Sequence, residues 1–452
     1  MYVLRDYQRR AVDKGLLFIK DKTSKKKPVI VAPTAAGKSL LVAAIADGLD
    51  FPIVVLQPTK ELLMQNYNKY TAFGNEAKIF SASLKTKEIG HVTFATIGSI
   101  VNRVADFKAL GVKLVLIDEC HLTCAPTGQI NKFLKGLGNV KILGLTATPV
   151  VLANTLEGPK LLMVNRTRKS LWNDILFVTQ IKELVDNNYW AKLIYDIVDL
   201  DEKSLKYNVS RSEFTEESIE KVYEDNDVDS LIVKKVEEIR NERKHILIFC
   251  PSILKARQLQ ERIDNSTVIW GTMPTQERDV AIQEFKDGIT QVMINVLILS
   301  VGFDMEWLDC VIDSVPTASI GRYYQKNGRA VRIWPTKKDS LIVDLSGNFN
   351  RFGRLEDITF EDCPGIGWGM FSGKKLLTGI NVDQIGTVLK PNVVEIAEKQ
   401  TEMDNPVIQF GKHKGKRLKD IPRSYSAWLL ENFEWKNYNK DLKNAITKLL
   451  AT

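Results

Sequence analysis

A stretch of small residues that ends in lysine and serine stands where a strand is expected to give way to a helix. Apolar runs flank it at 29–31 and 40–45. Backbone amides at a helix start suit phosphate oxygens, Lys38 can reach the terminal phosphates of a nucleotide, and Ser39 can ligate Mg²⁺. A chance strand and helix with this pattern is the alternative, because Ala32 stands where the usual pattern has glycine. The candidate phosphate loop comprises Pro33, Thr34, Ala35, Ala36, Gly37, Lys38 and Ser39.

Two adjacent carboxylates end another apolar run. Residues 114–117 are typical of a buried strand, and Asp118 and Glu119 follow directly. Asp118 can hold Mg²⁺ while Glu119 polarises an attacking water, which hydrolysis of a phosphoanhydride requires. Paired acids at a strand end are also common on surfaces, so the functional interpretation depends on their position roughly 80 residues after the phosphate loop.

Arg329 and Arg332 lie three residues apart, which would place both on one turn of a helix. In that arrangement both side chains could point into a cleft toward the terminal phosphate of a nucleotide. A solvated helix face is the alternative for two arginines at this spacing.

Short β-rich apolar runs alternate with longer helix-like stretches in two parts of the chain, which is typical of α/β domains with parallel sheets. We predict one such domain at 1–155 and a second at 201–350, joined by a linker at 156–200. Glycines and then a basic, aromatic segment predict a small C-terminal α+β domain at 351–452. The expected strands lie at 29–32, 53–56, 92–95, 114–117, 142–145, 246–250, 267–270, 292–296, 310–313 and 341–345.

In their order along residues 1–350, these motifs and several others resemble those of superfamily-two helicases. The further segments are 4–8, 57–62, 96–99, 118–121, 145–149, 300–304 and 325–332. The resemblance implies two tandem RecA-like domains that close on ATP and Mg²⁺ and reopen after hydrolysis.

The resemblance also implies roles for individual residues. The implied catalytic residues are Lys38, Asp118, Glu119, Gln325, Arg329 and Arg332, with Ser39 and Asp118 on the metal. Besides the phosphate loop, the nucleotide would contact Arg5, Gln8, Gly302 and Asp304. The implied coupling residues are His121, Thr146 and Thr148, and the implied contacts to the DNA backbone are Pro58, Thr59 and Thr96.

The acidic motif reads Asp-Glu-Cys-His and the coupling motif Thr-Ala-Thr, which differ from the RNA helicases named for Asp-Glu-Ala-Asp. The compact two-domain core, with the stretch 180–191 between the domains, is similar to restriction-enzyme motors and to UvsW-type phage helicases. The short chain without a nuclease motif favours the phage type. This likeness implies a DNA helicase that unwinds or branch-migrates forked and junction DNA in replication, recombination or repair. Two alternatives stay open: an RNA helicase or RNA-stimulated ATPase, and a DNA translocase that does not separate strands.

The net charge of +8 is concentrated at the C-terminus, where the segment from Pro406 onward holds ten Lys and Arg against four Asp and Glu. This segment resembles a small module found in some phage proteins and near exonuclease domains. Lysines on a glycine-flanked loop can bind phosphates, and nearby aromatics can stack on bases or form the small domain's core. The candidate DNA contacts there are Lys412, Lys414, Lys416 and Arg417.

Composition argues against several classes of protein. Apolar residues make up 44% and charged residues 26%, no apolar run approaches the ~20 residues of a membrane span, and a signal-peptide layout is missing. We therefore expect a cytoplasmic protein, in the host cytoplasm if phage-encoded, and a monomer. Five scattered cysteines predict free thiols. Cys120, His121 and Cys124 cluster, but a zinc site would need a fourth ligand.

Overall fold

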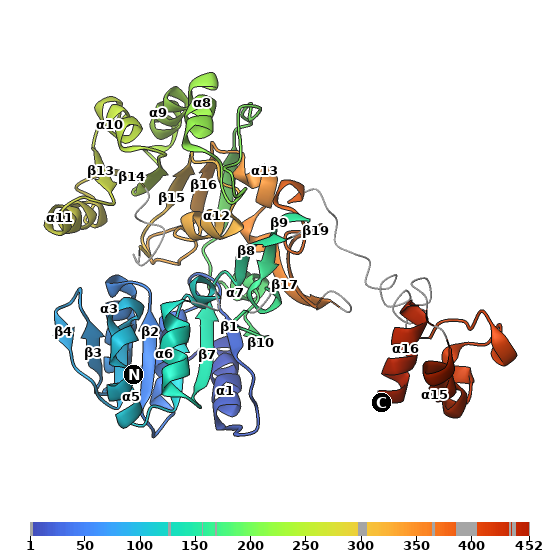
Figure 1. The fold of residues 1–452 in the computed structure, drawn as a ribbon. Coiled ribbons are helices and arrows are strands. Elements are labelled where there is room, and N and C mark those ends of the chain that lie inside the picture. The colour runs from blue at the N-terminus through green and yellow to red at the C-terminus, as the bar shows by residue number, and fades with distance from the viewer. Residues whose placement is uncertain are drawn as a thin grey trace. The chain divides into compact units, whose positions relative to one another are not determined.

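The computed structural model describes residues 3–124, 128–155, 157–167, 170–296, 305–363, 367–385, 405–433, 435 and 440–451. The chain divides into two compact units, residues 1–360 with 370–388 and residues 361–369 with 389–452. The first unit contains two large parallel sheets, shown in blue to orange in Figure 1. The predicted pair of α/β domains is therefore confirmed.

The first sheet has eight strands in the order β10-β1-β7-β6-β2-β5-β3-β4. Every strand pair in it is parallel except β3 with β4. In chain order the strands are β1 (Pro28–Val31), β2 (Ile53–Gln57), β3 (Lys78–Ser81), β4 (Thr86–Lys87), β5 (Val92–Thr96), β6 (Leu114–Ile117), β7 (Lys141–Thr146) and β10 (Asp174–Val178). The helices of this domain are α1 (Asp6–Lys20), α2 (Lys38–Asp47), α3 (Lys60–Thr71), α4 (Ile97–Ile100), α5 (Val104–Ala109) and α6 (Gln129–Leu137).

The central strands β1, β2, β5 and β6 are short aliphatic runs buried along their whole length. Strands of a parallel sheet have this composition because both of their faces are covered. Since these strands run in one direction, the loops that follow them meet at one edge of the sheet, where ligands of α/β folds bind. The phosphate loop, the acidic pair, Pro58 and Thr59 follow strands at this edge, and Thr96 is the last residue of β5.

The second sheet has six parallel strands in the order β11-β16-β15-β12-β14-β13. In chain order they are β11 (Leu193–Ile197), β12 (Ile246–Phe249), β13 (Ser266–Trp270), β14 (Val292–Val296), β15 (Cys310–Asp313) and β16 (Ser340–Asp344). The accompanying helices are α8 (Glu216–Asp225), α9 (Val228–Ile239), α10 (Ile253–Arg262), α11 (Thr275–Lys286), α12 (Ile320–Asn327) and α13 (Asn348–Phe352). Each of the ten strands expected from the sequence is present in one of the two sheets.

The predicted domain boundaries differ from the structure in three places. Residues 156–200 are no simple linker, because they supply β10 to the first sheet and β11 to the second, with α7 (Ile181–Asp186) between them. The second domain accordingly begins before residue 201. These strands were missed because residues 156–200 show no regular alternation of apolar and polar side chains.

The third difference concerns the start of the C-terminal domain. After residue 350 the chain forms a three-stranded sheet of β17 (Ile358–Cys363), β18 (Gly367–Ser372) and β19 (Lys375–Leu376). The Gln180 side chain exchanges hydrogen bonds of 2.6 and 3.1 Å with the backbone of Phe360. The start of this sheet therefore belongs with the first unit, as does the hairpin of β8 (Val150–Thr155) and β9 (Gly158–Met163).

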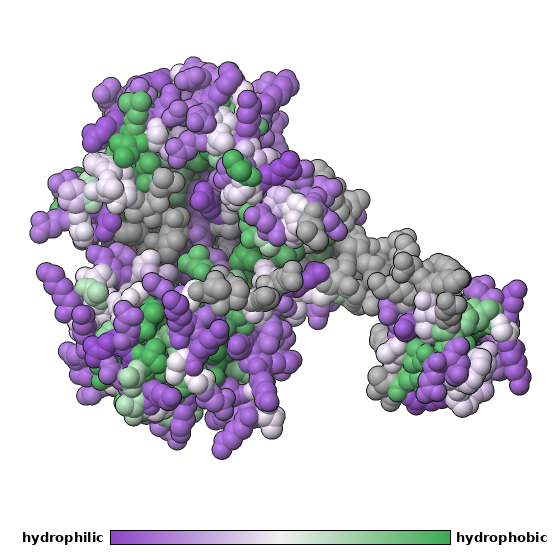
Figure 2. All heavy atoms as spheres, in the orientation of Figure 1, coloured by the Kyte–Doolittle hydropathy of each residue, from purple (hydrophilic) through white to green (hydrophobic). Residues whose placement is uncertain are grey.

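The second unit contains α15 (Arg423–Asn432) and α16 (Lys440–Ala451), preceded by 3-10 turns and a bridge between Val407 and Arg417. Its core consists of small and aliphatic side chains, among them Ile408, Leu418 and Ile446. Figure 2 shows hydrophilic residues over much of the visible face of the two sheet domains. Within the described ranges, none of the helices has the length and apolar character needed to cross a membrane.

Candidate active site

The loop between β1 and α2 has the backbone shape of a phosphate cradle. Ala35 and Gly37 adopt left-handed conformations with φ of 62° and 78°. The Ala36 carbonyl accepts hydrogen bonds from the Tyr7 hydroxyl at 3.0 Å and from Gln8 Nε2 at 2.9 Å. A Cβ atom on Gly37 would lie 2.5 Å from Gln8 Nε2, so this position requires glycine both for its φ and for its close contact.

Lys38, the first residue of α2, occupies the centre of the site. Its Nζ lies 3.1 Å from Asp118 Oδ1 and also contacts Glu119. Burial lowers the pKa of Lys38, but the charges of Asp118 and Glu119 outweigh burial and raise this pKa above its ordinary value. The Asn66 amide donates a 2.9 Å hydrogen bond to Asp118 Oδ2. A charged lysine therefore pairs with both carboxylates, and Asn66 fixes the orientation of Asp118.

Glu119 is the second residue after β6. It has an unusual left-handed conformation with φ of 46°, and its amide donates to Asp118 Oδ1 at 2.9 Å. Burial raises the pKa of Glu119, but the charges of Lys38, His121 and Arg329 lower it below its ordinary value overall. Among the described residues, Glu119 Oε2 accepts no hydrogen bond, although His121 Nδ1 lies 3.5 Å away. Glu119 is thus an ionised, buried carboxylate with an oxygen available to a water molecule.

A chain of contacts leads from Glu119 to the second domain. The His121 ring nitrogen Nδ1 lies 2.8 Å from Thr146 Oγ1, which also accepts a 3.1 Å hydrogen bond from the Thr148 amide. Burial lowers the pKa of His121, which favours its neutral form. Thr148 in turn lies beside α12, since a Cβ on Gly321 would be 4.0 Å from its Cβ. The three predicted coupling residues therefore form one continuous path.

The second domain contributes three predicted catalytic side chains to the same cavity. Gln325, Arg329 and Arg332 line a space of about 270 Å³ together with Lys38 and Glu119. The prediction that both arginines share a helical turn was wrong, because α12 ends at Asn327 and both follow it in turns. The Gly328 amide donates to the Tyr324 carbonyl at 2.8 Å and closes the helix.

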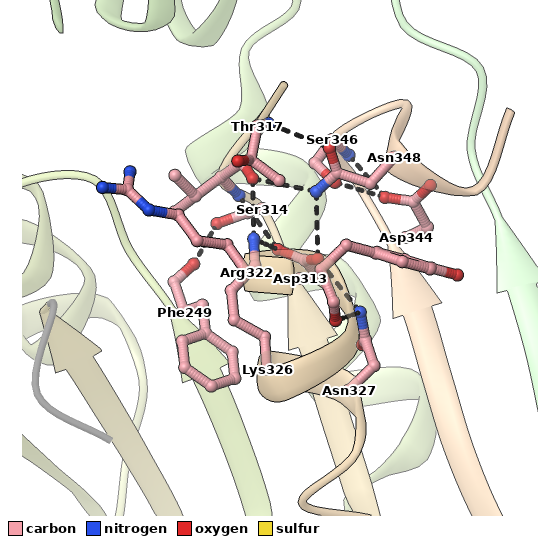
Figure 3. Close-up of polar contacts among 12 residues, drawn as sticks. Phe249, Asp313, Ser314, Thr317, Arg322, Lys326, Asn327, Asp344, Ser346 and Asn348 are labelled. Atoms are coloured by element: carbon pink, nitrogen blue, oxygen red, sulfur yellow. Dashed lines mark hydrogen bonds and ion pairs between the residues drawn. The ribbon is translucent and has the colours of Figure 1, made fainter. Parts of the chain in front are cut away.

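A buried polar network holds α12 on the second sheet (Figure 3). Asp313, at the end of β15, forms an ion pair with Lys326 and accepts hydrogen bonds from Asn327 at 3.2 Å and Asn348 at 3.0 Å. Lys326 also donates to the Val315 carbonyl at 2.8 Å. Because Lys326 and Asn327 belong to α12, this network fixes the helix that presents Gln325.

The phosphate loop is held by residues that sequence reasoning missed. The Trp190 indole donates to the Thr34 carbonyl at 3.1 Å, and the Thr34 amide donates to the Tyr324 hydroxyl at 3.1 Å. The Arg5 guanidinium lies 3.9 Å from the centre of the Tyr189 ring, and both residues line the cavity. A cation above an aromatic ring is favourable, so this contact stabilises both side chains at the wall of the cavity.

The residues that make these contacts differ in how well the sequence marks them as functional. Asn66 lies on the buried face of α3, where a polar residue normally needs a partner, so its burial could have pointed to a functional contact. Trp190 and Tyr189 lie in a segment interpreted as linker, and nothing local marks them. The side chain of Gln8, a predicted nucleotide contact, donates from Nε2 to the Ala36 carbonyl and accepts from the Arg5 amide at Oε1.

The remaining predicted site residues lie at other positions. Pro58 and Thr59 follow β2, where the Thr59 hydroxyl accepts a 3.3 Å hydrogen bond from the Leu62 amide. Thr96 ends β5, and its hydroxyl lies 2.8 Å from Ser99 Oγ. Gly302 and Asp304 lie outside the described residues. The predicted basic contacts of the C-terminal unit, Lys412, Lys414, Lys416 and Arg417, are all exposed.

The donor set of the cavity fits a nucleotide-bound Mg²⁺ ion. Ser39 and Asp118 line it beside the phosphate loop, and Mg²⁺ prefers hydroxyl, carboxylate and phosphate oxygens. Glu119 adds a buried carboxylate oxygen without a hydrogen bond from the described residues. These residues could hold the ion, which would neutralise charge on the phosphates during hydrolysis.

Comparison with protein families gives one match for each sheet domain. Residues 1–151 match the family "Type III restriction enzyme, res subunit", and residues 226–333 match "Helicase conserved C-terminal domain". The matched regions contain the phosphate loop and acidic pair in the first case and both arginines in the second.

Two proteins with detectable sequence similarity carry helicase names. IRC3 of Saccharomyces cerevisiae, an ATP-dependent helicase by name, is 23% identical over 392 residues, which cover 80% of this chain and 55% of IRC3. The chain therefore spans about half the length of that relative. The ATP-dependent RNA helicase eIF4A of Candida glabrata is 23% identical over 295 residues, 62% of this chain and 66% of eIF4A.

A solved structure shares the arrangement of the two sheets. The DNA-bound Type ISP restriction-modification enzyme LlaBIII superposes with a TM-score of 0.54 at 15% identity. The superposition covers 76% of this chain and 28% of LlaBIII. At this identity the likeness concerns the fold.

Proposed function

Because the chain carries the two RecA-like domains of a superfamily-two helicase, we propose that it is an ATP-driven motor that separates or branch-migrates strands of forked and junction DNA. The observation that carries the proposal is the convergence of residues from both domains on one cavity. Lys38 and Glu119 enter it from the first domain and Arg329 and Arg332 from the second.

The geometry supports hydrolysis that depends on closure of the two domains. Lys38 pairs with Asp118 and Glu119. Triphosphate oxygens at the loop would compete for Lys38 and leave Glu119 to orient a water. Arg329 and Arg332 would stabilise charge that develops on the terminal phosphate, so hydrolysis would require the second domain to be in place.

The contacts from Glu119 through His121 and Thr146 to Thr148 support a coupling between hydrolysis and domain movement. Thr148 lies beside α12, which presents Gln325. Loss of the terminal phosphate would alter the contacts at both ends of this path. Such a change would bias the two domains toward opening.

DNA is favoured as the substrate by the family that matches the first domain, which is named for restriction enzymes, a class that acts on DNA. The acidic motif Asp-Glu-Cys-His also differs from the Asp-Glu-Ala-Asp of the RNA helicases named for it. The similarity to eIF4A favours RNA as the second candidate substrate. The choice of forked and junction DNA rests on the resemblance of the short core to phage branch-migration helicases.

The proposal is tested by ATP-dependent strand release from a forked duplex, a four-way junction, a simple tailed duplex and an RNA duplex of matched length. We expect release from forks and junctions to be fastest. Preference for the RNA duplex would move the assignment to an RNA helicase. ATP hydrolysis without any strand release would indicate a translocase.

The same assay with variants tests the site. Lys38→Ala and Glu119→Gln should lower ATP hydrolysis by at least about 100-fold, since both remove groups that act on the phosphates or the water. Lys22→Ala is the matched control, because Lys22 is exposed in the first domain and does not line the cavity. Turnover retained by either site variant would contradict the assigned roles.

A further inference from the structure

Three aromatic rings form a ladder on the surface of the C-terminal unit. The His413 ring lies 4.5 Å from the Tyr425 ring, and Tyr425 lies 5.7 Å from Trp428 at an angle of only 22°. Tyr425 and Trp428 are three residues apart on α15, so they share one face of the helix. Trp428 ends the ladder with 52% of its surface exposed.

The other aromatics of this unit have a different role. The Phe410 and Phe433 rings stack at 4.2 Å and 6°, and Trp435 packs edge-on to Phe433 at 5.0 Å. These three side chains pack against the aliphatic core, whereas Trp428 is not part of that cluster. The sequence left open whether the aromatics form the core or stack on bases. Tyr425 is half-buried against the same core, whereas Trp428 lies outside that cluster.

A basic loop lies directly beside the ladder. Gly411 and Gly415 adopt φ of 69° and 86° and shape the loop. A Cβ on Gly411 would lie 2.6 Å from the Tyr425 hydroxyl, so glycine permits the loop to approach the ladder closely. The exposed cations on and next to this loop are Lys412, Lys414, Lys416, Arg417, Lys419 and Arg423.

The loop lysines have no acidic partner among the described residues of the unit: over residues 405–433, 435 and 440–451, no ion pair involves Lys412, Lys414 or Lys416. A flat exposed ring next to uncompensated positive charge matches a strand whose bases are unpaired: the bases can stack on the ring while the phosphates lie against the lysines. A duplex would offer phosphates but no accessible base faces to Trp428.

We propose that the ladder and the basic loop form a second nucleic-acid site, specific for single-stranded DNA, that holds a released strand independently of ATP. This inference deepens the proposed function, since a strand-separating motor produces single strands. Trp428 and Tyr425 would stack on bases, and Lys412, Lys414 and Lys416 would contact the backbone.

The test measures fluorescence anisotropy of the full chain with a labelled oligothymidylate and with an abasic sugar-phosphate strand of the same length. Trp428→Ala should weaken binding to the oligothymidylate about five- to 100-fold, which corresponds to the usual effect of losing one base stack. Its affinity for the abasic strand should stay the same. Trp428→Tyr should restore most of the difference, which separates stacking from a folding defect.

The lysines are tested by the combined variant Lys412→Gln, Lys414→Gln, Lys416→Gln. It should weaken binding to both strands and lower the slope of log affinity against log salt by about 2, at roughly 0.7 per phosphate contact. Lys20→Gln, Lys22→Gln, Lys25→Gln is the control with the same change in net charge, because these residues are exposed in the first domain.

Two results would overturn the second site. The first is unchanged affinity for oligothymidylate in both Trp428→Ala and the triple lysine variant. That result would overturn the second site without contradicting ATP-driven strand release. An equal loss of duplex and single-strand affinity in Trp428→Ala would show that the ladder does not recognise bases. Absence of strand release with intact oligothymidylate binding would instead overturn the proposed strand separation alone.

Discussion

The buried ion pair between Lys326 and Asp313 gives a quantitative prediction about the second domain. Lys326 is 7% exposed and Asp313 is fully buried, so Lys326→Met leaves a carboxylate without its cation. Removal of one partner of a buried pair typically costs about 3–5 kcal/mol. Asp313 keeps its hydrogen bonds from Asn327 and Asn348, which places the expected loss near the lower limit, about 3 kcal/mol.

Hydrogen exchange of peptides from β12 and β15 measures this loss within the second sheet. A change of about 3 kcal/mol corresponds to exchange faster by roughly two orders of magnitude. Peptides from β1 and β2 in the first sheet should change little. Lys286→Met is the matched control, because Lys286 is exposed on α11.

A double variant distinguishes electrostatics from packing. Asp313→Asn combined with Lys326→Met leaves no uncompensated charge, so its exchange should be slower than the sum of the two single effects predicts. Additive effects would refute the electrostatic reasoning. Exchange in Lys326→Met equal to that of the unchanged chain would show that α12 is held by other contacts.

Two further predictions concern the loop and the arginine segment. Gly37→Ala should weaken ATP binding as measured by calorimetry. The new Cβ would lie 2.5 Å from Gln8 Nε2, and a left-handed conformation costs a non-glycine residue about 1–2 kcal/mol. Unchanged ATP affinity would contradict the assignment of this loop as the phosphate cradle. Burial lowers the pKa of Lys337 to about 8, and its ammonium donates to the carbonyls of Leu308 and Ala330. Above pH 8 the unfolded chain therefore binds more protons than the folded chain does. The free energy of unfolding should rise from pH 8 toward the unfolded pKa of about 10.4, and it should rise more in the original chain than in Lys337→Met. Urea midpoints of the two proteins that change in parallel across this range would refute this prediction.

Local sequence predicted the parts of the site that depend on strand ends. The phosphate loop and the acidic pair follow aliphatic runs, so their strands and their common edge could be inferred from pattern alone. Contacts between segments that are distant in the sequence could not be inferred in this way. The hydrogen bonds of Thr34 with Trp190 and Tyr324 join residues more than 150 positions apart, and no periodicity reports such pairs.

Helix ends were a second source of error. The spacing of Arg329 and Arg332 is compatible with a helical turn, yet α12 ends at Asn327, before both of them. Spacing alone does not reveal where a helix stops. The predicted position of both arginines at the cavity is not affected, because the residues that follow α12 still place Arg329 and Arg332 in its wall.

The segment between β10 and β11 is the direct connection between the two sheets. Only residues 179–192 separate the last residue of β10 from the first of β11. Gln180 attaches this segment to β17, and Trp190 attaches it to the phosphate loop. So short a tether keeps the arginine segment at a high effective concentration beside the phosphate loop. Closure is then an intramolecular step whose equilibrium the nucleotide can tip with modest binding energy.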